Sequence, residues 1–156
     1  MQTRTNQQYV DAVDAGIFPT DTPRVPIEDS FVDARGSIRN LLLCERGFSS
    51  VAEIKSKRGT VRANHYHKTD WHYTYVASGM VLYFERAVGD KKLPEYQIFG
   101  AGEMFFTPPM REHAMVFAKD TTILTFAKNV RNHEQHEADL VRVVVVDQAT
   151  VNQIVP

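Results

Sequence analysis

Three histidines stand within eight residues of one another, between two glycines, in the stretch GTVRANHYHKTDWHYTYVASG (59–79). His65 and His67 are two positions apart, and on a β-strand this spacing turns both imidazoles to one face because side chains alternate. The polar triplet KTD suits a turn, and His72 then lies in a second apolar run, 71–77, that can fold back beside the first. The spacing therefore predicts a hairpin that brings three imidazoles together, as a metal site or as a cluster of bases.

The same stretch resembles the first signature of the cupins, which combines a glycine, a His-x-His pair, a glutamate and a second glycine. Gly59, His65, His67 and Gly79 fall on this pattern, and His72 stands where the family usually has the glutamate. The resemblance implies that His65 and His67 belong to the functional site, with His72 beside them.

A second stretch, GEMFFTPPMREH, resembles the second cupin signature. Gly102, Pro108 and His113 fit that pattern, whereas Met110 replaces the usual glycine and Phe117 replaces the usual asparagine. Two motifs in the right order make the match specific. With the strands around them they cover most of residues 33–146. The expected fold is therefore all-β, an antiparallel cupin or jelly-roll small barrel with a short N-terminal helical arm.

The resemblance also implies one divalent transition metal, an Fe, Ni, Zn, Cu or Mn ion. Its expected ligands are His65, His67 and His113, with His72 as the fourth. Four neutral imidazoles leave the ion more charge than three imidazoles and a carboxylate do, so the site would polarise bound water or a carbonyl more strongly. Nitrogen ligands suit these metals better than Mg or Ca, but the ligand types do not choose among them.

A finer resemblance points to the nucleotide-sugar branch of the cupins, which holds deoxysugar ketoisomerases and epimerases and the cupin domain of capsular-sugar reductases. It rests on Arg62 in the string Arg-x-x-His-x-His and on the string Phe-x-Asp-x-Arg-Gly at 31–36. The resemblance makes Arg62 a candidate substrate-binding residue. Strict alternation turns Arg62 away from the face that holds His65, so this role requires a bulge in the strand.

Three functional classes follow, all acting on or binding a small molecule. The leading expectation is a metal-dependent cupin enzyme with isomerase, epimerase or dioxygenase chemistry on a small polar or carbohydrate-like substrate. The first alternative is a metal-free nucleotide-sugar ketoisomerase or epimerase, in which His65 or His67 is the catalytic base, since imidazole titrates near neutrality. The second alternative is a non-catalytic ligand-binding or sensory cupin.

Composition limits the partners of the chain. It has 156 residues, of which 24% are charged, and a net charge of −1, which gives no electrostatic reason to expect nucleic acid or an anionic membrane as a partner. The first ten residues lack an apolar signal core, and no apolar run approaches the roughly 18–20 residues of a membrane span. The single cysteine, Cys44, cannot form an internal disulfide, so the expected location is the cytosol.

The remaining elements follow from caps, prolines and alternation. A short helix is expected over 6–15, with a proline-containing connector after it, so residues 1–30 form an N-terminal arm and residues 31–156 the barrel. Such an arm favours a homodimer. About ten short strands follow, as in a sandwich or barrel. His133 and His136 lie in a polar connector, which we interpret as a solvated loop.

Overall fold

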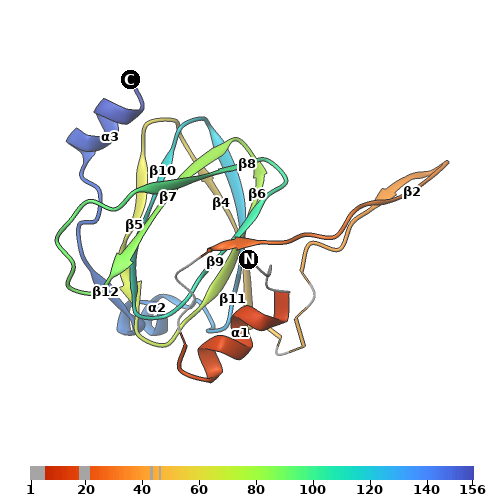
Figure 1. The fold of residues 1–156 in the computed structure, drawn as a ribbon, viewed down its shortest axis with the longest axis horizontal. Coiled ribbons are helices and arrows are strands. Elements are labelled where there is room, and N and C mark those ends of the chain that lie inside the picture. The colour runs from red at the N-terminus through yellow and green to blue at the C-terminus, as the bar shows by residue number, and fades with distance from the viewer. Residues whose placement is uncertain (1–5, 18–21, 43, 46) are drawn as a thin grey trace.

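The computed structural model describes residues 6–17, 22–42, 44–45 and 47–156. Its strands form two five-stranded sheets, in which every pair of neighbours is antiparallel, and a separate two-stranded hairpin. The two large sheets face each other and enclose the interior of a barrel (Figure 1). The all-β antiparallel fold expected from alternation and from the two histidine signatures is confirmed.

The first sheet has the order β1-β9-β6-β11-β4 and the second the order β12-β5-β10-β7-β8. The first sheet consists of β1 (Arg24–Val25), β9 (Met104–Thr107), β6 (His72–Ser78), β11 (Thr121–Ala127) and β4 (Ser50–Ser56). The second consists of β12 (Leu140–Arg142), β5 (Val61–His67), β10 (Arg111–Phe117), β7 (Met80–Ala87) and β8 (Tyr96–Gly100). The remaining elements are α1 (Asn6–Asp14), β2 (Phe31–Asp33), β3 (Gly36–Ile38), α2 (His133–Asp139) and α3 (Gln148–Ile154).

The space between the sheets is filled at one end by an apolar core and lined at the other by histidines. The core consists of Val76, Val81, Tyr83, Phe99, Phe105, Met115, Phe117 and Ile123, all buried. Val81 and Tyr83 in β7, like Met115 and Phe117 in β10, are two positions apart, because alternate side chains of a strand point into the barrel. Continuing the same alternation toward the other end brings His72 and His113 to the inner face.

Two helices cover the outer faces of the sheets. Helix α1 packs on the first sheet through Tyr9, whose ring lies 5.2 Å from that of Phe106 between centroids. Tyr73 belongs to the same outer cluster, on the face opposite to His72, as alternation predicts. Helix α3 packs on the second sheet, where Val151 joins the cluster that contains Val116. Among the described residues, no helix is both long and apolar enough to cross a membrane.

The turn between β6 and β7 requires a glycine. Gly79 has a φ of +90°, and a Cβ atom at this position would lie 2.6 Å from the Cα of Thr121. Any other side chain would therefore collide with backbone as well as adopt an unfavourable conformation. The second glycine of the first histidine motif is thus a structural requirement of the barrel.

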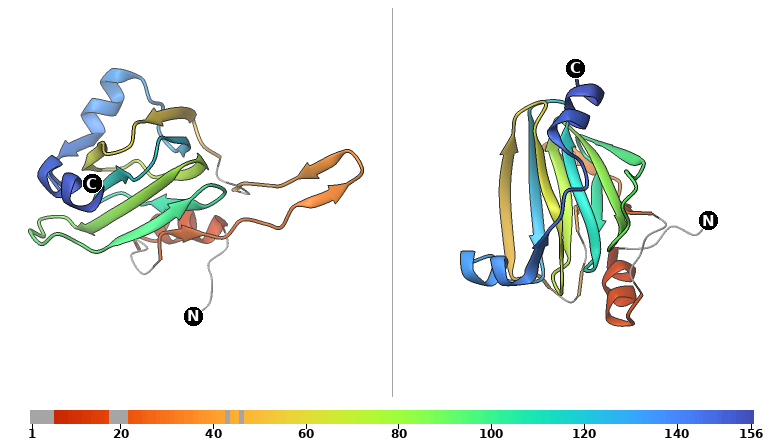
Figure 2. Two further views of the ribbon diagram at one scale, coloured as in Figure 1. Left: turned by 90° about the horizontal axis from the view of Figure 1, so that it is seen from above. Right: turned by 90° about the vertical axis from the view of Figure 1, so that its left-hand side faces the viewer.

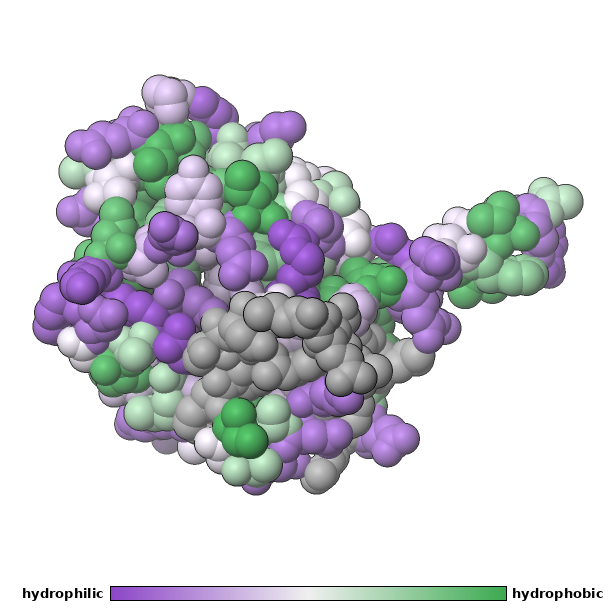
Figure 3. Space-filling model, in the orientation of Figure 1, coloured by the Kyte–Doolittle hydropathy of each residue, from purple (hydrophilic) through white to green (hydrophobic). Residues whose placement is uncertain are grey.

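The β2–β3 hairpin projects from the barrel as an arm (Figures 1 and 2). Its strands pair only with each other in the described structure, and Phe31 lies opposite Ile38. Phe31, Val32 and Ile38 are 62%, 69% and 64% exposed, and hydrophobic side chains are visible on the arm in Figure 3. A two-stranded hairpin is marginally stable alone in water. This arm therefore exposes apolar surface that the rest of the chain leaves uncovered.

Candidate functional site

Strands β5, β6 and β10 bring four imidazoles together inside one end of the barrel. We call His65, His67, His72 and His113 the histidine cluster. The ring centroids of His65 lie 4.8 Å from those of both His67 and His113, and His72 lies 5.4 Å from His67 and 5.8 Å from His113. His67, His72 and His113 are buried. The structure thus places all four histidines chosen from the sequence side by side.

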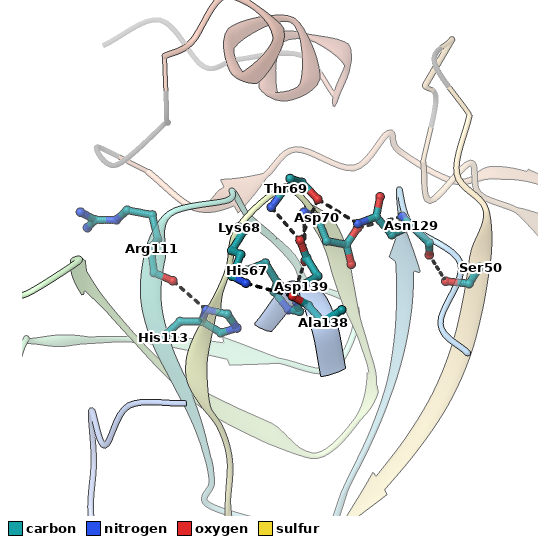
Figure 4. A network of polar contacts seen from close by, with 10 residues as sticks. All are labelled: Ser50, His67, Lys68, Thr69, Asp70, Arg111, His113, Asn129, Ala138 and Asp139. Atoms are coloured by element: carbon teal, nitrogen blue, oxygen red, sulfur yellow. Dashed lines mark hydrogen bonds and ion pairs between the residues drawn. The ribbon is translucent and has the colours of Figure 1, made fainter. Parts of the chain in front are cut away.

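Asp139, the last residue of α2, anchors this cluster to the turn between β5 and β6. Its Oδ2 lies 3.1 Å from Nδ1 of His67 and accepts a hydrogen bond from the backbone N–H of Asp70. Its Oδ1 accepts hydrogen bonds from the backbone N–H of Thr69 at 2.9 Å and from its hydroxyl at 2.7 Å (Figure 4). One carboxylate therefore fixes both the turn and the orientation of the His67 ring.

Hydrogen bonds at Nδ1 leave the inner nitrogens of two rings free. The Nδ1–H of His67 donates to Asp139, and that of His113 donates to the carbonyl of Arg111 at 3.0 Å (Figure 4). These contacts place the proton on Nδ1, so each Nε2 carries a lone pair. Nε2 of His67 and Nδ1 of His72 are buried without a hydrogen-bond partner among the described residues. Buried polar atoms of this kind normally meet a water, a metal or a ligand.

Burial holds the cluster in its neutral form. It is the largest cause that lowers the pKa of His65 to about 2, of His67 to about 3 and of His113 to about 4, and it also lowers the pKa of His72 well below its usual value. The charge of Asp139 acts in the opposite direction on His67. All four imidazoles are therefore neutral at neutral pH. Each has one nitrogen with a lone pair, which can accept a proton or bind a metal ion.

The donor atoms form two overlapping groups rather than one group of four. The possible ligand atoms of His65, His67 and His113 lie within 4.8 Å of one another, and so do those of His67, Asp70 and His72. The first group fits a divalent transition metal, because three imidazoles in close contact are ligands that such ions prefer. His72 belongs to the second group, on the other side of His67.

A bulge in β5 sets the position of His65. The register between β5 and β10 shifts after the pair His65–His113, and Ala63 and Asn64 both have positive φ values, of 69° and 51°. The Asn64 side chain stabilises this bulge: its amide donates to the carbonyl of Val146 at 2.9 Å, and its Oδ1 accepts from the N–H groups of Val145 and Val146. The bulge that precedes His65 is therefore stabilised by the segment after β12.

Arg62 lies beyond this bulge and reaches strand β4 instead of the histidine cluster. Its Nε donates to the hydroxyl of Ser56 at 2.8 Å, and its Nη2 donates to the carbonyl of Lys55 at 3.3 Å. The side chain is exposed. Arg62 is the one residue of the sequence-based site that the structure does not bring to the four imidazoles.

A cavity opens beside the cluster between β5, β12 and α2, with a volume of about 550 Å³. His65 and His136 line it, and so do Arg142 and Glu137, which form an ion pair at 2.9 Å. Arg142 lies opposite His65 in the strand register, so both side chains leave the sheet on the same face. The cavity therefore reaches the histidine cluster at His65.

The segment 131–139 supplies three site residues that sequence reasoning missed. The solvated-loop interpretation of His136 is wrong, because this residue lies in α2, half-buried, with its ring 5.6 Å from that of His67. Asp139 lies three residues further, on the same side of the helix. Arg131 precedes the helix, and its charge acts on the whole cluster. The sequence signal that could have predicted this helix is Asn132. It is the N-cap, and its side chain accepts a hydrogen bond from the N–H of Gln135.

Comparison with known proteins gives solved structures as the informative matches. No protein-family model matches the chain, and no curated protein sequence matches it. A 3,4-ketoisomerase from Helicobacter canadensis aligns with a TM-score of 0.62 at 17% identity, over 88% of this chain and 98% of that one. The rmlC epimerase of Mycobacterium tuberculosis aligns with a TM-score of 0.64 at 14% identity, over 83% of this chain and 76% of that one.

A third solved structure carries a ligand in its description. It is a double mutant of the QdtA 3,4-ketoisomerase from Thermoanaerobacterium thermosaccharolyticum in complex with TDP, with a TM-score of 0.54 and 17% identity, over 73% of this chain and 82% of that one. These likenesses show that the chain has the jelly-roll fold of the cupins. Within that class, the structures that it resembles here are sugar ketoisomerases and epimerases.

Proposed function

We propose that this protein is an isomerase or epimerase that moves a proton on a carbon next to a ketone, in the sugar of a nucleotide sugar. The observation that carries the proposal is the pair formed by His67 and Asp139, which leaves Nε2 of His67 buried, unprotonated and without a partner among the described residues. The likeness in fold to sugar ketoisomerases and epimerases supports the choice of substrate.

In this reaction His67 acts as the general base. Its Nε2 takes the proton from the carbon, the electron pair of the C–H bond forms a C=C bond, and the ketone oxygen becomes an enolate. Asp139 accepts a hydrogen bond from Nδ1 and stabilises the imidazolium that forms, as a carboxylate behind a catalytic histidine does. The imidazolium of His67 then returns this proton to a carbon of the enolate, the C=O bond re-forms and the base is neutral again; His65, whose ring centroid lies 4.8 Å from that of His67, is close enough to take the proton from His67 and deliver it in its place.

The cavity between β5, β12 and α2 supports a ligand of this size. Its volume of about 550 Å³ falls in the range of about 300–1,000 Å³ that is typical of small-molecule sites. His65 and His136 line it, so a sugar placed at the cluster would leave the rest of the nucleotide sugar in the cavity.

The test is proton exchange on a 4-keto-6-deoxy sugar nucleotide in D₂O, followed by ¹H NMR. We expect the metal-chelated wild-type protein to exchange a proton next to the ketone, and His67→Gln to lose this activity by a factor of about 10² or more. His133→Gln is the matched control, because His133 begins the same helix but is exposed. Absence of exchange in the wild type with a panel of such sugars would remove the proposal.

A second candidate function is supported by the geometry of His65, His67 and His113. Their ligand atoms lie within 4.8 Å of one another, which fits one Fe, Ni, Zn, Cu or Mn ion, with His72 beyond them as an additional ligand. A bound ion would polarise a water or carbonyl oxygen. Elemental analysis of the purified protein tests this function. We expect about one metal ion per chain in the wild type and none in His113→Gln. Dioxygenase chemistry would in addition require oxygen uptake.

We also propose that the protein is a homodimer. The arm of residues 31–38 exposes Phe31, Val32 and Ile38, and apolar surface of this kind in a projecting hairpin fits a second copy of the chain. The cytosol stays the predicted location, on the basis of the single cysteine.

A further inference from the structure

A buried ion pair lies on the outer face of the second sheet. Arg86 in β7 and Glu112 in β10 are opposite each other in the strand register and are 7% and 3% exposed. Nε of Arg86 donates to Oε2 of Glu112 at 2.7 Å. Phe84 and Ala114, two positions further along the same strands, belong to the outer apolar cluster that also contains Val145. The ion pair therefore shares the face of that cluster and points away from the histidine cluster.

The guanidinium of Arg86 joins two segments that are not neighbours in the sheet. Its Nη1 donates to the carbonyl of Lys92 at 2.9 Å, in the connection between β7 and β8. Its Nη2 donates to the carbonyl of Val144 at 3.1 Å, in the segment after β12. Oε1 of Glu112 accepts from the N–H of Gly89 at 2.9 Å. Each nitrogen of the guanidinium thus has an acceptor, which a buried ion pair requires because removing two charges from water is costly.

The segment of residues 143–146 connects this ion pair to the site. Its first two residues line the cavity together with Asn64 and His65. The N–H groups of its last two residues donate to Oδ1 of Asn64 at 2.9 and 3.1 Å, and the N–H of Val143 donates to the backbone carbonyl of Asn64 at 2.9 Å. Asn64 belongs to the bulge that directly precedes His65. Hydrogen bonds therefore link Arg86, through this segment, to the residue before His65.

We propose that Arg86 is a positioning residue of the site: by fixing residues 143–146 it sets the wall of the cavity and the place of His65. Packing alone does not explain Arg86, because apolar side chains of similar volume often replace a buried ion pair without loss of stability. Apolar side chains do not supply a rigid fork of donors that bonds one carboxylate and two carbonyls at once. The consequence for catalysis rests on the isomerase proposed above, in which His65 is close enough to deliver the proton.

The first test follows the histidine rings of metal-free protein in long-range ¹H–¹⁵N spectra, independently of turnover. Arg86→Lys keeps the positive charge beside Glu112, but a single amine cannot replace the fork that reaches Val144. We expect the ring signals of His65 to shift or broaden, whereas those of His72, which lies in the other sheet, stay as in the wild type. Loss of stability alone would not select one ring. Unchanged His65 signals in the folded variant would overturn the proposal.

Arg24→Lys is the matched control. Arg24 also forms an ion pair, with Glu103, and its Nη2 donates to a backbone carbonyl, that of Ile98, at 2.7 Å. These contacts belong to β1 and the edge strand β8 and do not involve residues 143–146. The same substitution is therefore expected to leave the His65 signals unchanged. A shift of equal size in Arg24→Lys would contradict the specific role of Arg86.

A double variant tests the route through Asn64. Asn64→Gly removes the side-chain hydrogen bonds, while glycine readily adopts the φ of 51° at this position. We expect it to change the His65 signals as Arg86→Lys does, and the variant with both substitutions to show no further change, because the two residues act on His65 in series. Two shifts that add up in the double variant would contradict this route.

A second variant keeps the test decisive if Arg86→Lys does not fold. Arg86→Met/Glu112→Leu removes both charges together, so that no unpaired charge stays buried. The same selective change of the His65 signals is expected, because the bond to the carbonyl of Val144 is lost in this variant too. His65 signals as in the wild type would show that the ion pair does not position the site.

Turnover separates this proposal from the isomerase function. With a 4-keto-6-deoxy sugar nucleotide that the wild type accepts, Arg86→Lys is expected to lose a factor of about 10–10² in kcat/KM, as a displaced catalytic group does. A protein that turns over no keto sugar, but in which Arg86→Lys changes the His65 signals selectively, keeps Arg86 as a positioning residue and loses only the isomerase function. Turnover by the wild type together with unchanged His65 signals in Arg86→Lys has the opposite meaning.

Discussion

His67 and Asp139 are 72 residues apart in the sequence, yet Nδ1 of one lies 3.1 Å from Oδ2 of the other. The pair joins a buried strand residue to the end of a helix that has no buried residue of its own. The histidine gains a fixed orientation and a fixed tautomer from this contact, and the helix gains its attachment to the barrel. Binding, proton transfer and local stability therefore depend on the same hydrogen bond.

Asp139→Asn tests this dependence. The amide keeps the shape but can present an N–H to Nδ1, which favours the proton on Nε2 and removes the lone pair that the proposed base needs. We expect a loss of turnover of about 10²–10⁴-fold and a loss of about 1–3 kcal/mol in the free energy of unfolding. Steady-state kinetics and urea unfolding measure the two effects. Turnover at the wild-type level would show that Asp139 does not orient a catalytic base.

The pH dependence of stability follows from the lowered pKa values of the histidine cluster. The unfolded rings have a pKa of about 6.5 and bind protons that the folded rings do not, so stability is fully present above this pH and is lost as the pH falls. Each such histidine contributes a slope of about 1.4 kcal/mol per pH unit. The loss extends downward toward the folded pKa, which is about 4 for His113 and about 3 for His67.

Urea unfolding of metal-free protein between pH 8 and pH 5 measures this slope. We expect a constant midpoint above about pH 7 and a steep decrease below about pH 6.5. His133→Gln is the control and should retain the slope, since that residue is exposed. A midpoint that is flat between pH 7 and pH 5 would show that the rings are protonated in the folded state.

Met110 occupies the glycine position of the second motif and has a φ of 57°, in the left-handed region. A side chain costs about 1–2 kcal/mol in this conformation, whereas glycine adopts it freely but loses more entropy on folding. We therefore expect Met110→Gly to raise the free energy of unfolding by about 0.5–1 kcal/mol, measured by urea unfolding. Destabilisation by this substitution would mean that the half-exposed Met110 side chain contributes contacts that outweigh the strain.

The arm provides a test of the proposed dimer. Phe31 and Ile38 lie opposite each other in the hairpin, so replacing both with Ser removes one side of its apolar surface. We expect the wild type to sediment at twice the 17.8 kDa chain mass and the Phe31→Ser/Ile38→Ser variant at the mass of one chain. Val88→Ser is the control, because Val88 is exposed on a different part of the molecule. A monomeric wild type would remove the proposal.

Much of the fold and the four imidazoles could be predicted because both depend on local patterns. The His-x-His spacing and the alternation of apolar residues fix which face a side chain takes, once the strands are known. The alternation is less informative about where a strand ends: β3 stops at Ile38 and β12 at Arg142, although apolar residues continue in the sequence after both. After β12, the N–H groups of Val145 and Val146 donate to the side chain of Asn64 instead of continuing a backbone ladder.

The parts of the site that escaped prediction depend on contacts between distant segments. Nothing near Asp139 in the sequence indicates His67, and the polar composition around His136 is typical of a solvated loop. The position of Arg62 could not be predicted for a different reason. The bulge at Ala63 and Asn64 changes the direction of the chain, but no Gly or Pro in the sequence marks it. The ion pair of Glu112 and Arg86 is a further contact between distant segments: Glu112 is buried, and its Oε2 lies 2.7 Å from Nε of Arg86, 26 residues away in the sequence.

The side chain of Asn64 links the position of His65 to a segment that lies far away in the sequence. The amide of Asn64 forms hydrogen bonds with the backbone of Val145 and Val146, and the next residue along β5 is His65. Loosening residues 143–146, by mutation or by a fused label that pulls on them, would let the kink in β5 relax and swing that ring out of line. Substitutions in the segment that follows β12 can therefore change the position of His65 without altering any histidine.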